Sequence, residues 1–466
     1  MPARRSSPTP ARQAALAVLR AVADRGAYAN LLLPTVLAER GLHGRDAALA
    51  TELAYGTLRG RGTYDAVLAA CSTRPLDAID PPVLDALRLG THQLLATRIG
   101  PHAAVATSVE LAREAAGTGA AGFTNAVLRR VAARDLASWI GAVAPDRASD
   151  PIGHLAVRTS HPRWIVAAFA ESLGEDPASA LPCTEAALAA DGARPQVTLC
   201  AVPGLADQAE LAEQAGHAAR WSPFGVYSEG GDPGALALVR EGRAAVQDEA
   251  SQLAALALTR AGAGAPGGRW LDLCAGPGGK ARLLAGLAAG SGTRLVAADV
   301  REHRARLVRA ATAATGGTAV LVADATRPAW RPDSFGRVLA DVPCSGLGAL
   351  RRRPDARWRK SPADVAALGP LQRSLLRSAI DAAGPGGVIA YVTCSPHVAE
   401  TRAVVNDVAG ARDDVTVLDA PALLGEVPDL ACPAPSEAYA QFWPHRHGTD
   451  AIFLALLQKR PTQNGS

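Results

Sequence analysis

The sequence predicts a multidomain protein with an all-α N-terminal bundle, a small α+β domain and a C-terminal α/β domain built on a parallel sheet. Two observations lead to this prediction. From about residue 11 to 140, apolar side chains recur at helical spacing, and no strand-like alternation interrupts them. From about 241 onward, short runs of Val, Leu and Ala alternate with helical stretches, as in parallel sheets that carry helices on both faces.

The composition is that of a folded chain. Of the 466 residues, 48% are hydrophobic and 20% are charged, which excludes wholesale disorder. No apolar run is long enough to cross a membrane, and none follows the arginines near the N-terminus. We therefore expect neither a membrane helix nor a secretory signal. The net charge of +4 permits a nucleic-acid partner without demanding one.

The seven cysteines are scattered and odd in number, with no CxxC pair and no Cys/His cluster. Neither a disulfide framework nor a metal site is therefore expected, and reduced thiols favour a cytoplasmic location. The cysteines are Cys71, Cys183, Cys200, Cys274, Cys344, Cys394 and Cys432.

The N-terminal helices are predicted at 11–26, 47–71, 81–95, 102–117 and 123–136. A stretch rich in Pro, Gly, Asp and Ser at 141–155 then marks a boundary. Beyond this boundary, two helices and two strands make a small α+β domain; they are predicted at 160–174, 194–202, 206–216 and 224–229. The predicted domains are 1–145, 146–240 and 241–460, followed by a tail at 461–466.

The C-terminal domain is predicted to contain five strands with helices among them. The strands are predicted at 269–275, 294–300, 319–325, 337–342 and 387–394. The helices are predicted at 278–290, 302–314, 365–384 and 396–408. Ligands bind open sheets of this class at the carboxyl ends of the strands, so the residues that follow each strand are the candidates for function.

The first strand ends in a glycine-rich loop beside an acid, DLCAGPGGK at 272–280. The loop lacks the GxGxxG of a dinucleotide site, and Ala281 stands where a P-loop has Ser or Thr. A carboxylate here would repel a pyrophosphate and attract a cation, which suits the sulfonium and amino groups of S-adenosylmethionine; a tight structural turn is the alternative. The next two strands end in Asp299, suited to ribose hydroxyls, and Asp324, suited to an adenine amino group, although a single such Asp more often caps a helix.

The last two strands are each followed by a cysteine, Cys344 beside Asp341 and Cys394 after a threonine. A lone cysteine on a buried strand is usually inert, but two on neighbouring strand ends favour chemistry. A thiolate that adds to carbon 6 of a pyrimidine makes carbon 5 nucleophilic toward a sulfonium methyl group. For cytosine, nitrogen 3 then needs a proton or a hydrogen bond, and a base must remove the proton on carbon 5. Cys394, Asp341 and Cys344 supply this set.

These motifs resemble those of the Nop/Sun family of RNA cytosine-5 methyltransferases. DLCAGPGGK, DVPCSGLG and YVTCS are similar to its cofactor, proline-cysteine and threonine-cysteine motifs, and QDEASQL (247–253) and GTDAIFLALL (448–457) to further segments. The resemblance implies a Rossmann-like class I S-adenosylmethionine-dependent methyltransferase domain, with Cys394 as nucleophile and Cys344 in product release. The residues expected to bind the cofactor are Asp272, Cys274, Ala275, Gly276, Pro277, Gly278, Gly279, Lys280, Asp299, Asp324 and Asp341.

The helical part resembles the antitermination factor NusB in TELAYGTLRG (51–60) and GFTNAVLR (122–129). Within the family, this pairing of domains implies a cytosine of 16S ribosomal RNA as the target. The chain departs from the family at Val342 and Leu347, and in PHVAETRAVV (396–405), where the family commonly has Glu-Glu-Asn-Glu. It also has Ala-Ile-Phe in place of Gly-Phe-Phe near the C-terminus. These changes leave the catalytic set intact.

An arginine-rich segment, RRRPDARWRK at 351–360, follows the proline-cysteine motif and holds six basic residues and one acid. Arginine binds phosphate and stacks on bases, and tryptophan stacks as well. RNA contact is therefore expected, with a solvated charged loop as the alternative. The residues expected to contact RNA are Arg351, Arg352, Arg353, Arg357 and Trp358.

The main hypothesis is an S-adenosylmethionine-dependent cytosine-5 methyltransferase acting on ribosomal RNA, as a monomer without metal or membrane partners. Transfer RNA is the alternative substrate within this class. Two other classes stay open, namely a non-catalytic NusB-like scaffold for RNA or antitermination and a nicotinamide dehydrogenase. The glycine loop disfavours the dehydrogenase, and the presence of both cysteines disfavours the scaffold.

Overall fold

The computed structural model describes residues 9–176, 178–179, 181–262 and 268–461, and the chain divides into two compact units. Unit 1 comprises Met1–Ala170, Glu175–Arg194 and Leu350–Lys360; unit 2 comprises Glu171–Gly174, Pro195–Ala349 and Ser361–Ser466. The predicted middle domain at 146–240 is therefore divided, because its first helices belong to unit 1 and its strands to unit 2. Apart from Pro461, the predicted tail lies outside the described residues, as do residues 1–8.

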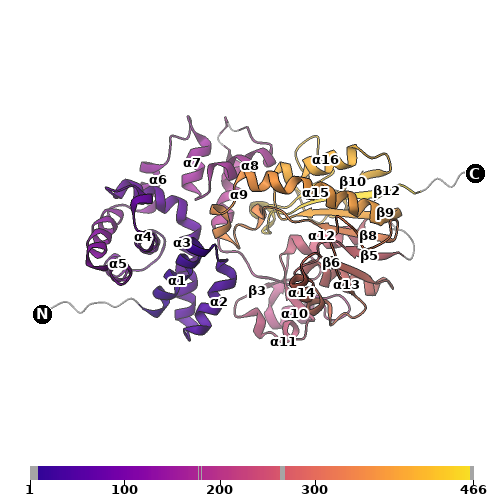
Figure 1. Cartoon of the computed structure of the whole chain (residues 1–466), viewed down its shortest axis with the longest axis horizontal. Helices are drawn as coiled ribbons and strands as arrows, with labels where there is room; N and C mark the ends of the chain where they lie inside the picture. Colours follow the sequence, from indigo (N-terminus) through magenta and orange to yellow (C-terminus); the bar gives the residue numbers. More distant parts are fainter. Residues whose placement is uncertain (1–8, 177, 180, 263–267, 462–466) are drawn as a thin grey trace, which may run out of the picture. The chain divides into compact units, whose positions relative to one another are not determined.

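Unit 1 is helical, as the sequence predicts (Figure 1). Its helices are α1 (Pro10–Arg25), α2 (Ala29–Glu39), α3 (Gly44–Cys71), α4 (Pro81–Ala96), α5 (Pro101–Val131), α6 (Leu136–Val143), α7 (Pro151–Arg158), the start of α8 (Arg163–Leu173), and α9 (Pro182–Gly192), with short 3-10 turns η1 (Leu76–Ala78) and η4 (Pro354–Trp358). Helix α1 has Pro10 in its first turn and ends at Gly26, which takes the left-handed conformation that glycine favours.

Helix α5 joins two helices that the sequence predicts separately. Ala116 and Gly117 inside it have non-helical backbone angles, and Gly117 has a φ of 85°. The gap predicted between the helices at 102–117 and 123–136 is thus reduced to a kink. Leucine and alanine fill the core of unit 1; Leu53, Leu87 and Leu111 are almost fully buried, in keeping with the scarcity of aromatic residues.

Unit 2 begins with a small antiparallel sheet in the order β2-β3-β1-β4. Its strands are β1 (Thr198–Ala201), β2 (Gly216–Ala218), β3 (Gly225–Ser228) and β4 (Ala244–Val246). They are accompanied by α10 (Gln208–Ala215), η2 (Pro233–Ala235) and α11 (Ala237–Arg240). The sequence predicts β1, β3 and α10 but not β2 or β4, which are only three residues long and carry too little pattern to be recognised.

The large sheet of unit 2 has the strand order β10-β12-β9-β8-β5-β6-β7, with β11 paired to β12. Its strands are β5 (Arg269–Asp272), β6 (Leu295–Asp299), β7 (Ala319–Val322), β8 (Phe335–Asp341), β9 (Ala383–Thr393), β10 (Val415–Leu418), β11 (Ala440–Gln441) and β12 (Phe453–Lys459). All pairs from β9 to β7 are parallel, whereas β12 runs antiparallel to β9 and β10. The five predicted strands are all present, and the chain reverses its direction of winding between β5 and β8, where open sheets bind ligands.

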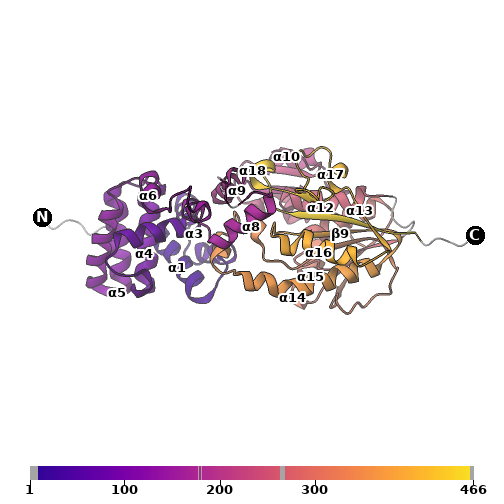
Figure 2. The ribbon, with the colours of Figure 1, turned by 90° about the horizontal axis from the view of Figure 1, so that it is seen from above.

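Helices cover both faces of this sheet (Figure 2). Helices α12 and α13 lie on one face, and α15 and α16 lie on the other. The helices of this part are α12 (Glu249–Arg260), α13 (Gly279–Gly290), α14 (Glu302–Thr312), α15 (Pro362–Ala382), α16 (Arg402–Gly410), α17 (Ala420–Leu423) and α18 (Pro444–His447), with the turns η3 (Leu347–Ala349) and η5 (Val398–Glu400).

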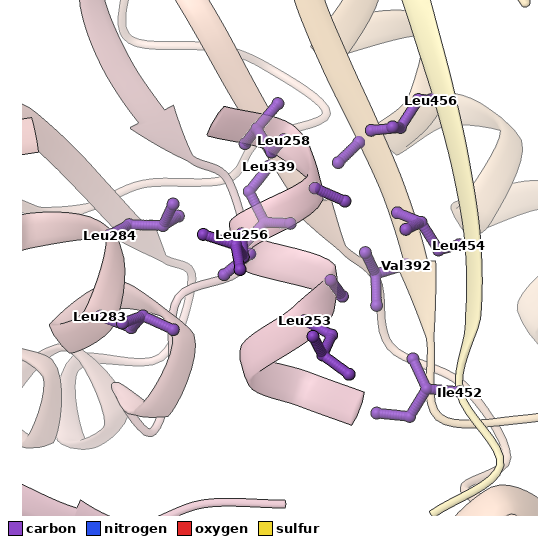
Figure 3. Packing of buried hydrophobic residues seen from close by; sticks show 14 of the residues in the cluster. Leu253, Leu256, Leu258, Leu283, Leu284, Leu339, Val392, Ile452, Leu454 and Leu456 are labelled. Atoms are coloured by element: carbon purple, nitrogen blue, oxygen red, sulfur yellow. The ribbon is translucent and has the colours of Figure 1, made fainter. Parts of the chain in front are cut away.

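The two faces of the sheet form separate cores because successive residues of a strand point to opposite sides. Leu339 of β8 packs in one cluster, while Val338 and Ala340 pack in the other. Figure 3 shows Leu339 beside the leucines of α12, with Val392 and Leu454 from the neighbouring strands close by. Packing on both faces therefore fixes the register of the strands. The strand ends in turn fix where the following loops begin. Among the described helices, none combines the length and apolar character that a membrane crossing requires.

Candidate active site

The glycine loop after β5 lies against the end of β6. The backbone N–H of Gly276 donates to Asp299 Oδ2 at 3.1 Å, and Arg304 donates to the Gly276 carbonyl at 2.5 Å. A Cβ at position 276 would stand 2.3 Å from Asp299 Oδ2, so this approach requires glycine. Gly278, with a φ of 116°, is the residue immediately before α13. The loop is thus a compact backbone cradle at the switch point of the sheet.

Asp272, the last residue of β5, is a buried carboxyl group at the base of this loop. Its side chain is 1% exposed, and among the described residues neither oxygen makes a hydrogen bond of normal geometry, although the Cys274 amide faces it. Burial and the nearby charge of Asp341 raise the pKa of Asp272 to about 8. A buried acceptor without a donor fits the cationic and amino groups of S-adenosylmethionine.

Asp299 is the last residue of β6 and Asp324 lies two residues after the end of β7, but their contacts differ. Asp299 is buried and accepts from the Arg301 N–H at 2.8 Å as well as from Gly276. Asp324 is exposed and accepts from the backbone and hydroxyl of Thr326 at 2.9 and 2.7 Å, which lowers its pKa. The Asp324 carboxylate thus stabilises a local turn, and its contact with adenine stays a prediction.

Lys280 and Asp341 form an ion pair between the glycine loop and the end of β8. Lys280 Nζ lies 2.9 Å from Asp341 Oδ2. Burial opposes the charge of Lys280, but Asp341, Cys394 and Asp272 together outweigh this effect and raise its pKa. A persistent cation therefore lies near Cys394.

The two strand-end cysteines converge, as the sequence predicts. Cys344 follows β8 and Cys394 follows β9, and in this parallel pair Asp341 lies opposite Val392. Cys344 Sγ and Cys394 Sγ are 3.2 Å apart, and both residues are partly accessible. The hydrogen bond with Cys394, followed by burial, raises the pKa of Cys344 well above its usual value. The arrangement places two thiols and an ion pair beside the cofactor loop.

A buried glutamate that the sequence analysis does not identify joins the two cysteine loops. Glu400, in η5, accepts hydrogen bonds from Ser345 and Ser395, the residues that follow the two cysteines. The repeated Cys-Ser dipeptide was the signal in the sequence, since two hydroxyls at equivalent strand ends call for a shared acceptor.

The arginine-rich segment differs from its prediction. Residues 350–360 belong to unit 1, and Arg357 is fully buried there, donating to the carbonyls of Arg59, Ser160 and Asp191 at 3.0, 3.3 and 2.7 Å. The expected RNA contact of Arg357 is therefore wrong, because its guanidinium is buried and hydrogen-bonded to backbone carbonyls. The Trp358 ring is partly buried, with the Arg61 guanidinium 5.5 Å from its centre, which leaves little of it for stacking on a base.

The other three arginines differ in accessibility. Arg351 is 5% exposed, Arg352 is partly exposed and Arg353 is exposed. Burial makes Arg351 a poor candidate for contact with RNA. Arg352 and Arg353 remain the candidates in this segment.

The fold and the site together are typical of one class of enzymes. A doubly wound sheet with β12 inserted antiparallel, a glycine cradle with buried acids and a helical domain ahead of it are the features of an S-adenosylmethionine-dependent methyltransferase with an added N-terminal domain. Residues 263–458 match the family described as 16S rRNA methyltransferase RsmB/F, and residues 9–133 match the NusB family.

Relatives cover almost the whole chain. A putative methyltransferase of Mycobacterium tuberculosis is 53% identical, covering 98% of both chains. The probable ribosomal RNA small subunit methyltransferase B of Bacillus subtilis is 31% identical, covering 97% of this chain and 99% of its own. The crystal structure of PH0851 shares the fold, with a TM-score of 0.76 over 98% of this chain at 21% identity. This chain belongs to the RsmB/F family of S-adenosylmethionine-dependent RNA methyltransferases.

Proposed function

We propose that this protein methylates carbon 5 of a cytosine in 16S ribosomal RNA through a covalent adduct with Cys394. The observation that carries the proposal is the pair of thiols 3.2 Å apart at the ends of β8 and β9. The ribosomal substrate is supported by relatives in Bacillus subtilis and Pseudomonas syringae, both described as ribosomal RNA small subunit methyltransferase B. Because both thiols must stay reduced, we also propose that the protein acts in the cytoplasm.

Cys394 is assigned as the nucleophile. The Lys280 ammonium, which interacts electrostatically with Cys394, favours its thiolate. The sulfur bonds to carbon 6 of the cytosine, and the electron pair of the carbon 5–carbon 6 double bond moves to carbon 5. S-adenosylmethionine supplies the methyl group, which its sulfonium makes electrophilic. A paired cytosine must first leave its stack to reach the sulfur.

Asp341, with its partner Lys280, is assigned to ring nitrogen 3. Addition of sulfur at carbon 6 increases the electron density on this nitrogen, which then needs a proton or a hydrogen bond. The Lys280–Asp341 pair carries both a donor and an acceptor at the strand end, and its separation of 2.9 Å keeps them together. We expect this pair to lower the barrier of the addition step.

Cys344 is assigned as the base that ends the reaction. After Cys344, which is partly accessible, has given its own proton to solvent, its thiolate takes the proton from carbon 5; the carbon–hydrogen electron pair restores the ring double bond, and the carbon 6–sulfur bond breaks to return Cys394 as a thiolate. The raised pKa of Cys344 makes its thiolate a strong base once formed. The 3.2 Å separation of the sulfurs brings this base to the ring that Cys394 holds.

The test is methylation of total RNA, from cells that lack this protein, with labelled S-adenosylmethionine, followed by mapping of the modified base. We expect Cys394→Ala to reduce methylation by about a thousandfold or more. Cys344→Ala should accumulate a protein–RNA adduct that survives denaturation. Cys183→Ala, at a partly exposed cysteine of unit 1, is the control and should behave as the parent.

Each remaining outcome of this test contradicts a part of the proposal. Full methylation by Cys394→Ala would disprove the covalent mechanism. Label found only in transfer RNA would disprove the ribosomal substrate. No label in any RNA would favour the scaffold hypothesis.

A further inference from the structure

Glu400 is a buried acid with an unusual number of donors. Its side chain is 0% exposed, and it lies five residues after Ser395, at the end of the turn η5. Oε1 accepts from the Ser345 N–H at 2.7 Å and from Gln372 Nε2 at 3.2 Å. Oε2 accepts from the hydroxyls of Ser345 and Ser395 at 2.5 and 2.7 Å, and the backbone carbonyl accepts from Tyr391 at 2.8 Å. Such a set satisfies the buried carboxylate fully.

These contacts join the two cysteine loops beyond the ends of their strands. Ser345 follows Cys344 and Ser395 follows Cys394, so one carboxylate holds both peptide segments next to the sulfurs. The sheet itself fixes the chain only up to Thr393, through pairs such as Asp341 with Val392. One backbone bond, from the Gly348 N–H to the Cys394 carbonyl at 2.9 Å, adds to the link.

We infer that Glu400 is a positioning residue that holds Cys344 and Cys394 within reach of one cytosine and keeps their chemical roles distinct. The catalytic half of this inference rests on the proposed function. The geometric half, that Glu400 sets the distance between the sulfurs, can be measured without any RNA.

The charge of Glu400 has a second effect. Cys344 interacts electrostatically with Cys394, Glu400 and Tyr391, and the negative charge of Glu400 adds to the rise of the pKa of Cys344. Cys394 instead interacts with the Lys280 cation. An anion beside one thiol and a cation beside the other favour the thiolate of Cys394 first, so that Cys394 attacks and Cys344 stays available as the later base.

Two substitutions separate these effects. In Glu400→Gln, the amide oxygen can accept from the Ser345 N–H and Gln372, while the NH2 group donates to the two hydroxyls, so the link is kept and the charge is lost. Glu400→Ala removes both. Glu249→Ala is the matched control, because Glu249 is 1% exposed and its carboxylate accepts hydrogen bonds from a different loop, at Trp221 and Ser222, and from Tyr227.

The first measurement is the rate at which a diazene oxidant converts the two thiols to a disulfide in the full-length protein, followed by mass spectrometry of the 344–394 cross-link. Oxidation removes two electrons and two protons from the thiols and reduces the diazene to a hydrazine. We expect Glu400→Ala to slow cross-linking by about tenfold, since preorganisation is lost, whereas Glu400→Gln and Glu249→Ala stay near the parent. A Glu400→Ala protein that cross-links as fast as the parent would overturn the inference.

The second measurement is methylation. Glu400→Ala should lower kcat by about tenfold or more with the KM for S-adenosylmethionine unchanged, and Glu400→Gln should restore most of kcat. Slower cross-linking with unchanged kcat would refute the catalytic half alone. Loss of the proposed function would appear separately, as methylation that survives Cys394→Ala.

The third measurement covers the case in which Glu400→Ala does not fold. Alkylation of Cys344 by iodoacetamide is followed against pH in the parent and in Glu400→Gln. Without the charge of Glu400, the pKa of Cys344 falls and its alkylation curve moves to lower pH. An unmoved Cys344 curve would refute the assigned role of the charge.

Discussion

The loops that follow β8 and β9 and the arginine-rich segment at 351–360 both bury polar groups, but the buried groups have different roles. In the loops, Glu400 and the Lys280–Asp341 pair hold side chains around two partly accessible sulfurs. In the segment, the Arg357 guanidinium donates hydrogen bonds to three backbone carbonyls of unit 1. A cluster of charged residues in a sequence therefore shows only where polar groups concentrate. Whether these groups bind a ligand or stabilise the fold depends on how deeply each one is buried.

Arg357→Ala should have the largest effect on stability. The substitution leaves the carbonyls of Arg59, Ser160 and Asp191 without their donor and opens a cavity in unit 1. We expect the free energy of unfolding to fall by about 3 kcal/mol, measured by urea denaturation. A loss of RNA affinity at unchanged stability would contradict the comparison, because it would show that Arg357 contacts RNA and does not stabilise unit 1.

Asp272→Asn should raise the free energy of unfolding at neutral and higher pH. With a pKa raised to about 8 by burial, folded Asp272 holds a proton that an unfolded Asp releases near pH 4, so folding takes up a proton between these values. The free energy of unfolding of the parent thus falls by up to about 1.4 kcal/mol per pH unit as the pH rises from 4 to 8. Asparagine does not titrate, so the variant lacks this contribution to the pH dependence.

The measurement for Asp272→Asn is thermal unfolding at pH 5, 6, 7 and 8 without cofactor. The advantage of the variant should grow from pH 5 to pH 8, while its affinity for S-adenosylmethionine should be weakened. Asp324→Asn is the control, because Asp324 is exposed and its pKa is lowered instead. Equal pH slopes in parent and Asp272→Asn would show that Asp272 is ionised in the folded state.

Arg353→Ala should have the smallest effect. Arg353 is exposed, so its removal should leave the melting temperature unchanged and weaken RNA binding only about two- to threefold, with a shallower dependence on salt. The measurement is a binding titration at several salt concentrations. An unchanged salt slope would remove Arg353 from the RNA interface and leave Arg352 as the remaining candidate of the segment.

Much of unit 2 could be predicted because its signals are local and repeated. Each of the five core strands is a short apolar run between turns, and parallel pairing brings their carboxyl ends to one edge. This geometry places the loops that carry Cys344 and Cys394 next to each other. The edge strand β10 and the short strands β2 and β4 were not predicted, because strands of three or four residues carry too little pattern.

The division of the chain into units could not be predicted from composition. The stretch rich in Pro, Gly, Asp and Ser at 141–155 indicates a boundary in the sequence, yet α7 (Pro151–Arg158) begins inside it, with Asp150 as its N-cap, and belongs to unit 1. Turn residues mark the end of an element, whereas a domain ends where long-range contacts cease. For the same reason, the membership of residues 350–360 in unit 1 has no local signal.

The order of residues along this chain by itself determined the helical and α/β parts, the glycine loop and the pairing of two strand-end cysteines, because each depends on spacing that backbone geometry turns directly into position. Only the tertiary structure decided that Glu400 joins the cysteine loops, that the carboxyl group of Asp272 is buried at the base of the glycine loop and that Arg357 belongs to the fold. These three outcomes depend on how much water each charged group loses, and that loss is set by the elements packed around it, many of them distant in sequence.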